Sequence, residues 1–131
     1  MIVADASWII ALRDPADGHH GDAVAVNETT ADQEILVHPV TLVECLVAPA
    51  TLGDLDDAAR KLRAAYEIID VDIHAPERWA RLRAHASLRL PDAIVLDAAL
   101  AHGATAILTF DDNLAAAATK RNIAINSLGV A

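Results

Sequence analysis

Four carboxylate residues stand in separate segments of the sequence, next to apolar runs, with no Lys or Arg beside any of them. They are Asp5, Glu44, Asp92 and Asp111. Carboxylates crowded together raise one another's pKa and cost stability. A hard divalent cation with oxygen ligands removes that repulsion. If the fold brings these acids together, the sequence predicts an Mg²⁺ or Mn²⁺ site that could activate water and stabilise a phosphoryl-transfer transition state.

Each acid also has a purely structural explanation. Thr41 and Glu44 have the spacing of a capping box, in which the Glu side chain closes the first turn of a helix. Asp92, and either Asp111 or Asp112, could cap the start of a helix. Such explanations account for the acids one at a time, whereas a shared site accounts for all four.

The elements that must position these acids alternate between short apolar runs and helical patterns. Strands are predicted over 2–5, 35–38, 68–72, 106–110 and 123–128, and helices over 7–14, 18–32, 41–53, 54–67, 76–88, 91–103 and 113–121. This order predicts one domain over 1–131, a three-layer α/β/α fold with a central parallel sheet of about five strands. Functional groups of such sheets gather at the carboxyl ends of the strands. Asp5 and Asp111 follow two strands, so we expect Asp92 and Glu44 to join them at that edge.

Composition and charge restrict the partners. The chain has 10 Lys and Arg against 19 Asp and Glu, a net charge of −9, and 54% hydrophobic residues. Nucleic-acid binders usually carry the opposite charge, so an RNA partner would require bound cations or local Arg residues. The single cysteine, Cys45, excludes an internal disulfide and suits the cytoplasm. No signal peptide or membrane helix is predicted.

Four motifs along the chain resemble one known family. They are VADAS, TLVECL, LPDAIVLDAALAHGA and ILTFDDNL. In order and spacing they are similar to those of PIN domains, most closely the VapC-type toxin ribonucleases of bacterial toxin–antitoxin pairs. The resemblance implies an Mg²⁺- or Mn²⁺-dependent endoribonuclease, inhibited by a small antitoxin protein and assembled as a homodimer. Its substrate would be an RNA whose identity the sequence does not specify.

By position, the resemblance makes Asp5, Glu44, Asp92 and Asp111 the catalytic and metal-binding quartet. Ser7 matches a hydroxyl near the site, whereas Ala6 replaces a position that often carries a second one. We expect Asp112 to cap a helix or to lie in the outer shell of the site. Asp97 is five residues after Asp92, about 140° around a helix, so it is expected at the rim or bound to metal through water.

Basic residues close to Asp92 are candidates for binding RNA. Arg83 and Arg89 are predicted to contact phosphates, against the alternative of an exposed helix face with ion pairs. Trp8 and Trp79 are expected to pack in the aromatic-poor core. Cys45 has no basic neighbour in the sequence to lower its pKa, so we expect a buried thiol rather than a nucleophile.

Two other functional classes remain open at this point. A receiver domain of a response regulator shares the parallel α/β plan and an acid cluster with Mg²⁺, but it needs a Lys after the last strand, where this chain has GVA. A binding protein with a catalytically inert metal site would use the same acids without cleaving RNA.

Overall fold

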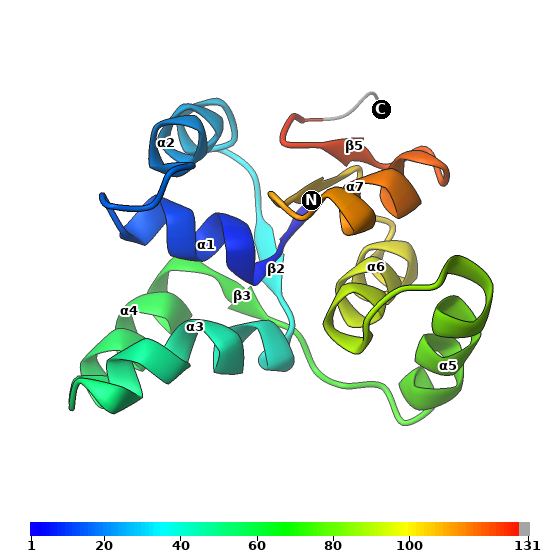
Figure 1. Cartoon of the computed structure of the whole chain (residues 1–131), viewed down its shortest axis with the longest axis horizontal. Coiled ribbons are helices and arrows are strands. Elements are labelled where there is room, and N and C mark those ends of the chain that lie inside the picture. The colour runs from blue at the N-terminus through cyan, green and yellow to red at the C-terminus, as the bar shows by residue number, and fades with distance from the viewer. Residues whose placement is uncertain (129–131) are drawn as a thin grey trace.

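The computed structural model describes residues 1–128 and has a single parallel sheet at its centre (Figure 1). Its five strands are β1 (Ile2–Ala4), β2 (Ile35–Val37), β3 (Glu67–Ile68), β4 (Ala106–Leu108) and β5 (Ala124–Ile125). They lie in the order β3-β2-β1-β4-β5, with every neighbouring pair parallel. The carboxyl ends of all five strands therefore point to one edge, and β1 lies at the centre of that edge.

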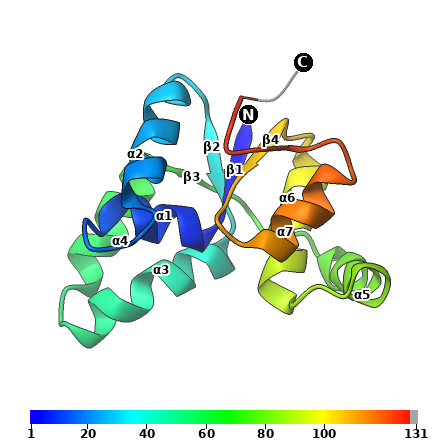
Figure 2. The same ribbon diagram turned by 45° about the horizontal axis from the view of Figure 1, so that its top comes forward.

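Seven helices within the described residues cover the sheet on both faces. They are α1 (Ala6–Arg13), α2 (His20–Thr29), α3 (Pro39–Thr51), α4 (Leu55–Ala65), α5 (Ala75–Ala86), α6 (Leu90–His102) and α7 (Asp112–Thr119). Figure 2 shows α1 to α4 on one side of the sheet and α5 to α7 on the other. The predicted three-layer α/β/α fold is confirmed. No helix among residues 1–128 is long and apolar enough to cross a membrane.

The alternation of side chains along β1 divides the core in two. Ile2 and Ala4 pack with Trp8 on the side of α1 to α4, whereas Val3 packs with Leu96 on the side of α5 to α7. Both faces of β1 are fully buried. Each such aliphatic side chain contributes about 1.5–3 kcal/mol, so a core nearly free of aromatic rings still fixes β1, and with it the position of Asp5.

The structure shortens or shifts several of the predicted elements. The strand expected over 68–72 has only the two residues of β3, and that expected over 123–128 only the two of β5. Both are edge strands with a neighbour on one side alone. Helix α3 begins at Pro39 instead of Thr41, because the ring nitrogen Nδ1 of His38 accepts the N–H of Val40. The predicted capping box of Thr41 is therefore wrong.

Candidate active site

Asp5 follows β1 at the centre of the sheet edge and is only 6% exposed. Its Oδ2 accepts hydrogen bonds from Ser7 Oγ at 2.7 Å and from Thr109 Oγ1 at 2.8 Å. Two hydroxyls from different segments thus fix the orientation of one buried carboxylate. Within the described residues Oδ1 has no hydrogen-bond partner, so this oxygen remains available to another ligand.

Thr109 connects the segments that follow β1, β4 and β5. While its hydroxyl donates to Asp5, the same oxygen accepts the N–H of Asp111 at 3.0 Å. Asn126 binds the backbone of Thr109 twice, accepting its N–H through Oδ1 and donating Nδ2 to its carbonyl, both at 2.8 Å. In a similar way Ser7 Oγ accepts the N–H of Phe110 at 2.9 Å. Neither Thr109 nor Asn126 was predicted as a site residue; the T-F-D turn of ILTFDDNL was the available signal for Thr109.

Asp111 uses its two carboxylate oxygens differently. Oδ1 accepts the N–H of Leu114 at 2.9 Å and caps α7, and Oδ2 accepts Arg89 Nη2 at 2.9 Å. The expectation that Asp112 caps this helix is wrong, because Asp112 is the first residue of α7 and its side chain is exposed. The adjacent acids are thus not equivalent. Asp111 faces the site, whereas the negative charge of Asp112 stabilises the positive N-terminal end of the α7 dipole.

Asp92 lies in the first turn of α6 with 3% of its surface exposed. Burial raises its pKa, and the carboxylate of Asp111 raises it further, while the guanidinium of Arg89 opposes the shift and Asp5 adds to it. Arg89 Nε lies 3.4 Å from Asp92 Oδ2. Because Arg89 also binds Asp111, Asp92 lies beside the carboxylate that follows β4.

Glu44 reaches the same centre from α3. Its pKa is raised, first by the partial loss of hydrating water near its neighbours and then by the carboxylates of Asp5 and Asp92, and Arg89 lowers it. The side chain is exposed and forms no ion pair within the described residues. Glu44 thus lies close enough to Asp5 and Asp92 for their charges to act on it, and Asp92 in turn lies near Asp111.

The donor set fits a hard divalent cation in its chemistry, since carboxylate oxygens are the ligands that Mg²⁺ prefers. Its geometry is less complete. Among residues 1–128, no group of three or more His, Cys, Asp or Glu side chains is arranged closely enough to hold an ion. Instead, Arg89 contacts both Asp92 and Asp111 and supplies positive charge at this point. Binding a cation would require the acids to draw closer and Arg89 to release them.

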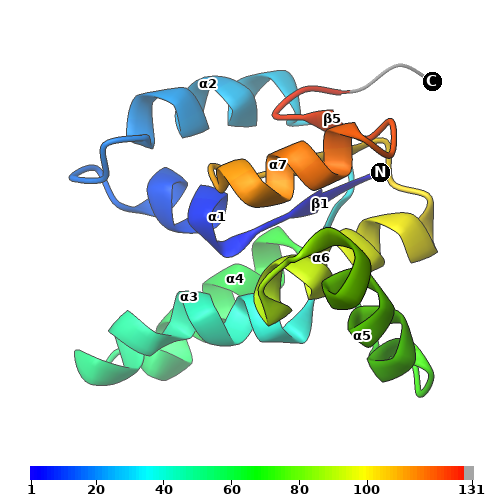
Figure 3. The same cartoon turned by 45° about the vertical axis from the view of Figure 1, so that its right-hand side comes forward.

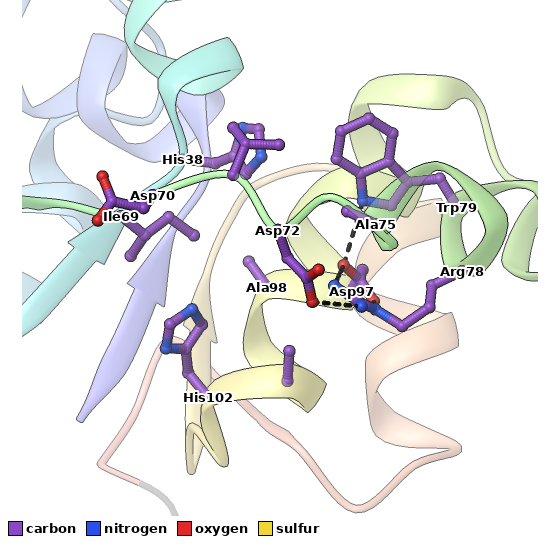
Figure 4. Close-up of a pocket in the computed structure, with 12 residues that line it drawn as sticks. His38, Ile69, Asp70, Asp72, Ala75, Arg78, Trp79, Asp97, Ala98 and His102 are labelled. Carbon is purple, nitrogen blue, oxygen red and sulfur yellow. Dashed lines mark hydrogen bonds and ion pairs between the residues drawn. The ribbon is translucent and has the colours of Figure 1, made fainter.

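Asp97 does not join the acid cluster. Its Oδ1 accepts Arg78 Nε at 2.7 Å, and its Oδ2 accepts Arg78 Nη2 and Trp79 Nε1, both at 3.1 Å (Figure 4). Arg78 also binds Asp72 at 2.7 Å, beside a cavity of about 330 Å³. Because the Asp97 carboxylate is engaged by two side chains of α5, we replace the predicted role at the rim by a structural one: it fixes α5 to α6.

Two other chemical candidates also have structural explanations. Arg83 Nε donates to the carbonyl of Leu88 at 3.3 Å and so closes the turn after α5, although its side chain is exposed. The thiol of Cys45 is partly buried on α3, and burial, followed by the negative charges of Glu44 and Asp5, raises its pKa to about 12. A thiol with this pKa is protonated at neutral pH and is not a nucleophile.

Comparison with solved structures identifies the same fold in several proteins, among them two from toxin–antitoxin systems. VapC20 of Mycobacterium tuberculosis, a toxin that cleaves the sarcin-ricin loop, has a TM-score of 0.73 and 20% identity, over 89% of this chain and 95% of that one. A toxin–antitoxin complex from Klebsiella pneumoniae has a TM-score of 0.74 and 22% identity, over 88% and 91%. PAE2754 from Pyrobaculum aerophilum has a TM-score of 0.63 and 18% identity, over 88% and 83%.

At these identities the structures show the shared fold alone. No curated protein sequence matches the chain. The family assignment comes from the sequence itself, because the model of the PIN domain family matches residues 2–120. That range contains β1 and β4, the strands that precede Asp5 and Asp111. It also contains α3 and α6, which carry Glu44 and Asp92. The chain belongs to the PIN domain family.

Proposed function

We propose that this protein is the toxin of a toxin–antitoxin pair and acts as a divalent-metal-dependent endoribonuclease. The observation that carries the proposal is the convergence of four acids at the carboxyl edge of the sheet. Thr109 connects Asp5 with Asp111, and Arg89 connects Asp111 with Asp92. Glu44 lies near enough to Asp5 and Asp92 for their charges to raise its pKa. The similarity in fold to a toxin that cleaves the sarcin-ricin loop, and to a toxin–antitoxin complex, supports it.

The acids, the hydroxyls and the arginine of the site would have separate roles in such a reaction. Asp5, Glu44, Asp92 and Asp111 would hold Mg²⁺ or Mn²⁺, which when bound lowers the pKa of a water and stabilises phosphoryl charge. The hydroxyls of Ser7 and Thr109 both donate to Oδ2 of Asp5. These two hydrogen bonds fix the orientation of the carboxylate and leave its Oδ1 for the ion. Once released from its carboxylates, Arg89 would face the scissile phosphate, which a planar guanidinium binds well.

The proposed partners need a surface as well as a site. Helix α3 exposes Val43 and Val47, each 61% accessible and four residues apart, and Leu52 follows with 82%. Leu52 also lines a hollow of about 480 Å³ between α1, α3 and α4. We propose that this apolar surface serves the homodimer and the antitoxin. The position of Arg89 shows that a guanidinium fits among the acids, so an antitoxin could inhibit with a basic side chain placed there.

The strand order decides against one alternative. Receiver domains have the flavodoxin-like order 2-1-3-4-5, whereas this sheet has the order β3-β2-β1-β4-β5. The receiver-like interpretation is therefore wrong. A catalytically inert metal-binding module would have the same geometry as the proposed nuclease, so only an activity measurement separates these two.

The decisive experiment is cleavage of total cellular RNA by purified protein with Mg²⁺ or Mn²⁺. Asp5→Asn and Asp92→Asn, which keep the size of the side chains, should each reduce the rate by at least about 100-fold, the scale of losing metal assistance. Asp32→Asn, on the exposed turn after α2, is the matched control. Cleavage that continues in both site variants, or in excess EDTA, would refute the mechanism. Metal binding without cleavage of any RNA would favour the inert module.

A further inference from the structure

Two segments of this acidic chain contain no acidic residue. Residues 78–91 and 113–131 have no Asp or Glu, although the chain has 19 of them. The same two segments carry six of the ten Lys and Arg residues: Arg78, Arg81, Arg83, Arg89, Lys120 and Arg121. Negative charge is therefore concentrated elsewhere in the chain, and these segments form its positive part.

The fold brings the two segments to the same side of the sheet. Helix α6 lies between α5 and α7 (Figure 3). A hollow of about 340 Å³ separates the end of α5 and its following turn from α7, and a second hollow, of about 380 Å³, extends it along α5. The two hollows share His85 and Arg121, and they add Lys120 and Arg81 respectively. We call the surface formed by Arg81, His85, Lys120 and Arg121 the basic groove.

The four side chains of the basic groove are not paired with acids, and the one acid that lines its two hollows, Asp97, is bound to Arg78. Within residues 1–128, none of the four residues of the groove forms an ion pair, whereas Arg60, Lys61, Arg78 and Arg89 all do. Arg121 has one hydrogen bond, from Nη1 to the carbonyl of Ala117 at 2.9 Å. The positive charge of Arg81, Lys120 and Arg121 is therefore available to an anionic ligand.

Stabilisation of helix ends is the alternative explanation. Cations near a helix C-terminus contribute about 0.3–1 kcal/mol each, and Lys120 lies at the end of α7. That gain is available to each helix alone. It does not explain why Lys120 and Arg121 border the same hollow with no acid in its lining, since like charges placed together repel. An anionic occupant of the groove removes the repulsion.

The basic groove extends toward the acid cluster. Its first hollow begins at Leu88 and Asn113, which are next to Arg89 and two residues from Asp111 in the sequence. From Asp111 the groove follows α7 to Lys120, a distance of about 13 Å at the rise of an α-helix. A strand held at its far end would thus pass the acids with a fixed direction.

We propose that the basic groove binds the sugar–phosphate backbone of a single-stranded RNA segment next to the bond that is cleaved. The inference rests on the proposed function for the identity of the polyanion. Phosphate contacts supply most of the sequence-independent affinity for nucleic acids and fix their register. A chain with a net charge of −9 repels RNA over the rest of its surface, so the basic groove would determine how the substrate approaches.

The test is RNA binding in EDTA, where a metal-dependent nuclease does not cut its ligand. The full-length chain would be titrated into a fluorescent, uridine-rich, single-stranded RNA at several salt concentrations. The variant Arg81→Gln/Lys120→Gln removes two exposed charges of the groove. The control Lys61→Gln/Arg63→Gln removes two exposed charges from α4, on the opposite face of the sheet. Thermal melting would show that both variants are folded.

We expect the groove variant to bind roughly tenfold more weakly at low salt, and the slope of log K against log salt to fall by about 1.4, at 0.7 for each phosphate contact in a single strand. The control should bind like the wild type. Equal affinity and slope in wild type, groove variant and control would overturn the inference, even if the protein cleaves RNA. If instead the wild type binds RNA through the groove but cleaves none with Mg²⁺ or Mn²⁺, the nuclease proposal fails and the groove assignment stands.

Discussion

Arg89 joins two acids that come from different elements of the fold. Its Nη2 donates to Asp111 at the start of α7 with a distance of 2.9 Å, and its Nε lies 3.4 Å from Asp92 in α6. The guanidinium is 70% exposed, whereas the carboxylate of Asp92 is almost fully buried. The protein therefore carries its own cation at the place where a metal ion is proposed to bind, and the two must compete for the same oxygens.

Arg89→Gln should therefore increase the affinity for Mn²⁺. An exposed ion pair contributes at most about 1 kcal/mol, so its loss should lower the Kd up to about fivefold. Calorimetric titration with Mn²⁺ measures this, and Arg83→Gln, with the same charge change six residues earlier, is the control. The metal-free variant should also melt at a lower temperature, since two acids lose their counter-charge. Weaker Mn²⁺ binding by Arg89→Gln would show that Arg89 helps the ion instead of competing with it.

The neighbouring acids Asp111 and Asp112 should respond differently to the same substitution. Asn caps helices as well as Asp does, so Asp111→Asn should preserve α7 while removing a charge from the site. We expect it to reduce metal affinity at least about tenfold, and Asp112→Asn to leave it unchanged, because only Asp111 shares Arg89 with Asp92. Asp111→Ala should in addition lose the cap, about 1 kcal/mol. Thermal melts with and without Mn²⁺ measure both effects, and equal losses from the two Asn variants would contradict the assignment.

The sequence was sufficient to predict the layers of the fold and the edge at which the acids meet. Apolar runs such as AIL at 106–108 are buried on both faces of the sheet. Because all of their side chains are apolar, the sequence alone predicts this burial. The roles of Asp97 and Asp112 could not be predicted in this way. Spacing places Asp97 on a helix, but its partners Arg78 and Trp79 come from another helix whose packing the sequence does not show.

The same limit applies to the residues that support the site from a distance. Asn126 lies 17 residues beyond Thr109, and nothing in the surrounding sequence indicates that its amide binds that backbone at both its N–H and its carbonyl. Its positive φ of 55° is a local feature that Asn tolerates better than most residues. Hydrogen bonds between elements that are distant in sequence depend on the assembled sheet, so they become visible only in the structure.

Asn126→Ala should destabilise the protein and loosen the site. The substitution leaves the N–H and carbonyl of the buried Thr109 without partners, which costs about 1–3 kcal/mol for a buried group. Because Thr109 also orients Asp5, the variant should bind Mn²⁺ more weakly. Asn122→Ala is a matched control, since Asn122 also has positive φ but is exposed and makes no side-chain hydrogen bond within residues 1–128. Chemical denaturation measures the stability, and equal losses in the two variants would assign the effect to backbone conformation alone.

Asp97→Asn should separate structural from functional acids. The amide cannot accept from Arg78 and Trp79 as the carboxylate does, so unfolding should require about 1–3 kcal/mol less free energy. Mn²⁺ affinity of the folded variant should remain that of the wild type, because the Asp97 carboxylate is bound to α5 and not directed to the acid cluster. Denaturation and calorimetry on the same sample test both statements. A large loss of metal affinity with stability unchanged would restore Asp97 to the site.

The raised pKa of Glu44 gives a prediction about pH. A carboxyl whose pKa is higher in the folded than in the unfolded state binds more protons when folded, so its contribution to stability decreases as pH rises through the interval between these two values. Above the folded pKa the penalty is complete. Metal-free Glu44→Gln should therefore be more stable than the wild type at neutral pH, by less than about 0.5 kcal/mol because the exposed side chain is screened by solvent.

That difference should disappear near pH 4, where Glu44 is largely protonated in both states of the wild type. Added Mn²⁺ should reverse the order of stability, since the cation stabilises the charged form of Glu44 and has one ligand fewer in the variant. Glu28→Gln, on the exposed surface of α2, is the control for charge removal alone. Melting curves from pH 4 to pH 8, with EDTA and with Mn²⁺, measure the crossover. If Glu44→Gln is less stable than the wild type at neutral pH without metal, Glu44 is not repelled by Asp5 and Asp92, and its place in the acid cluster is wrong.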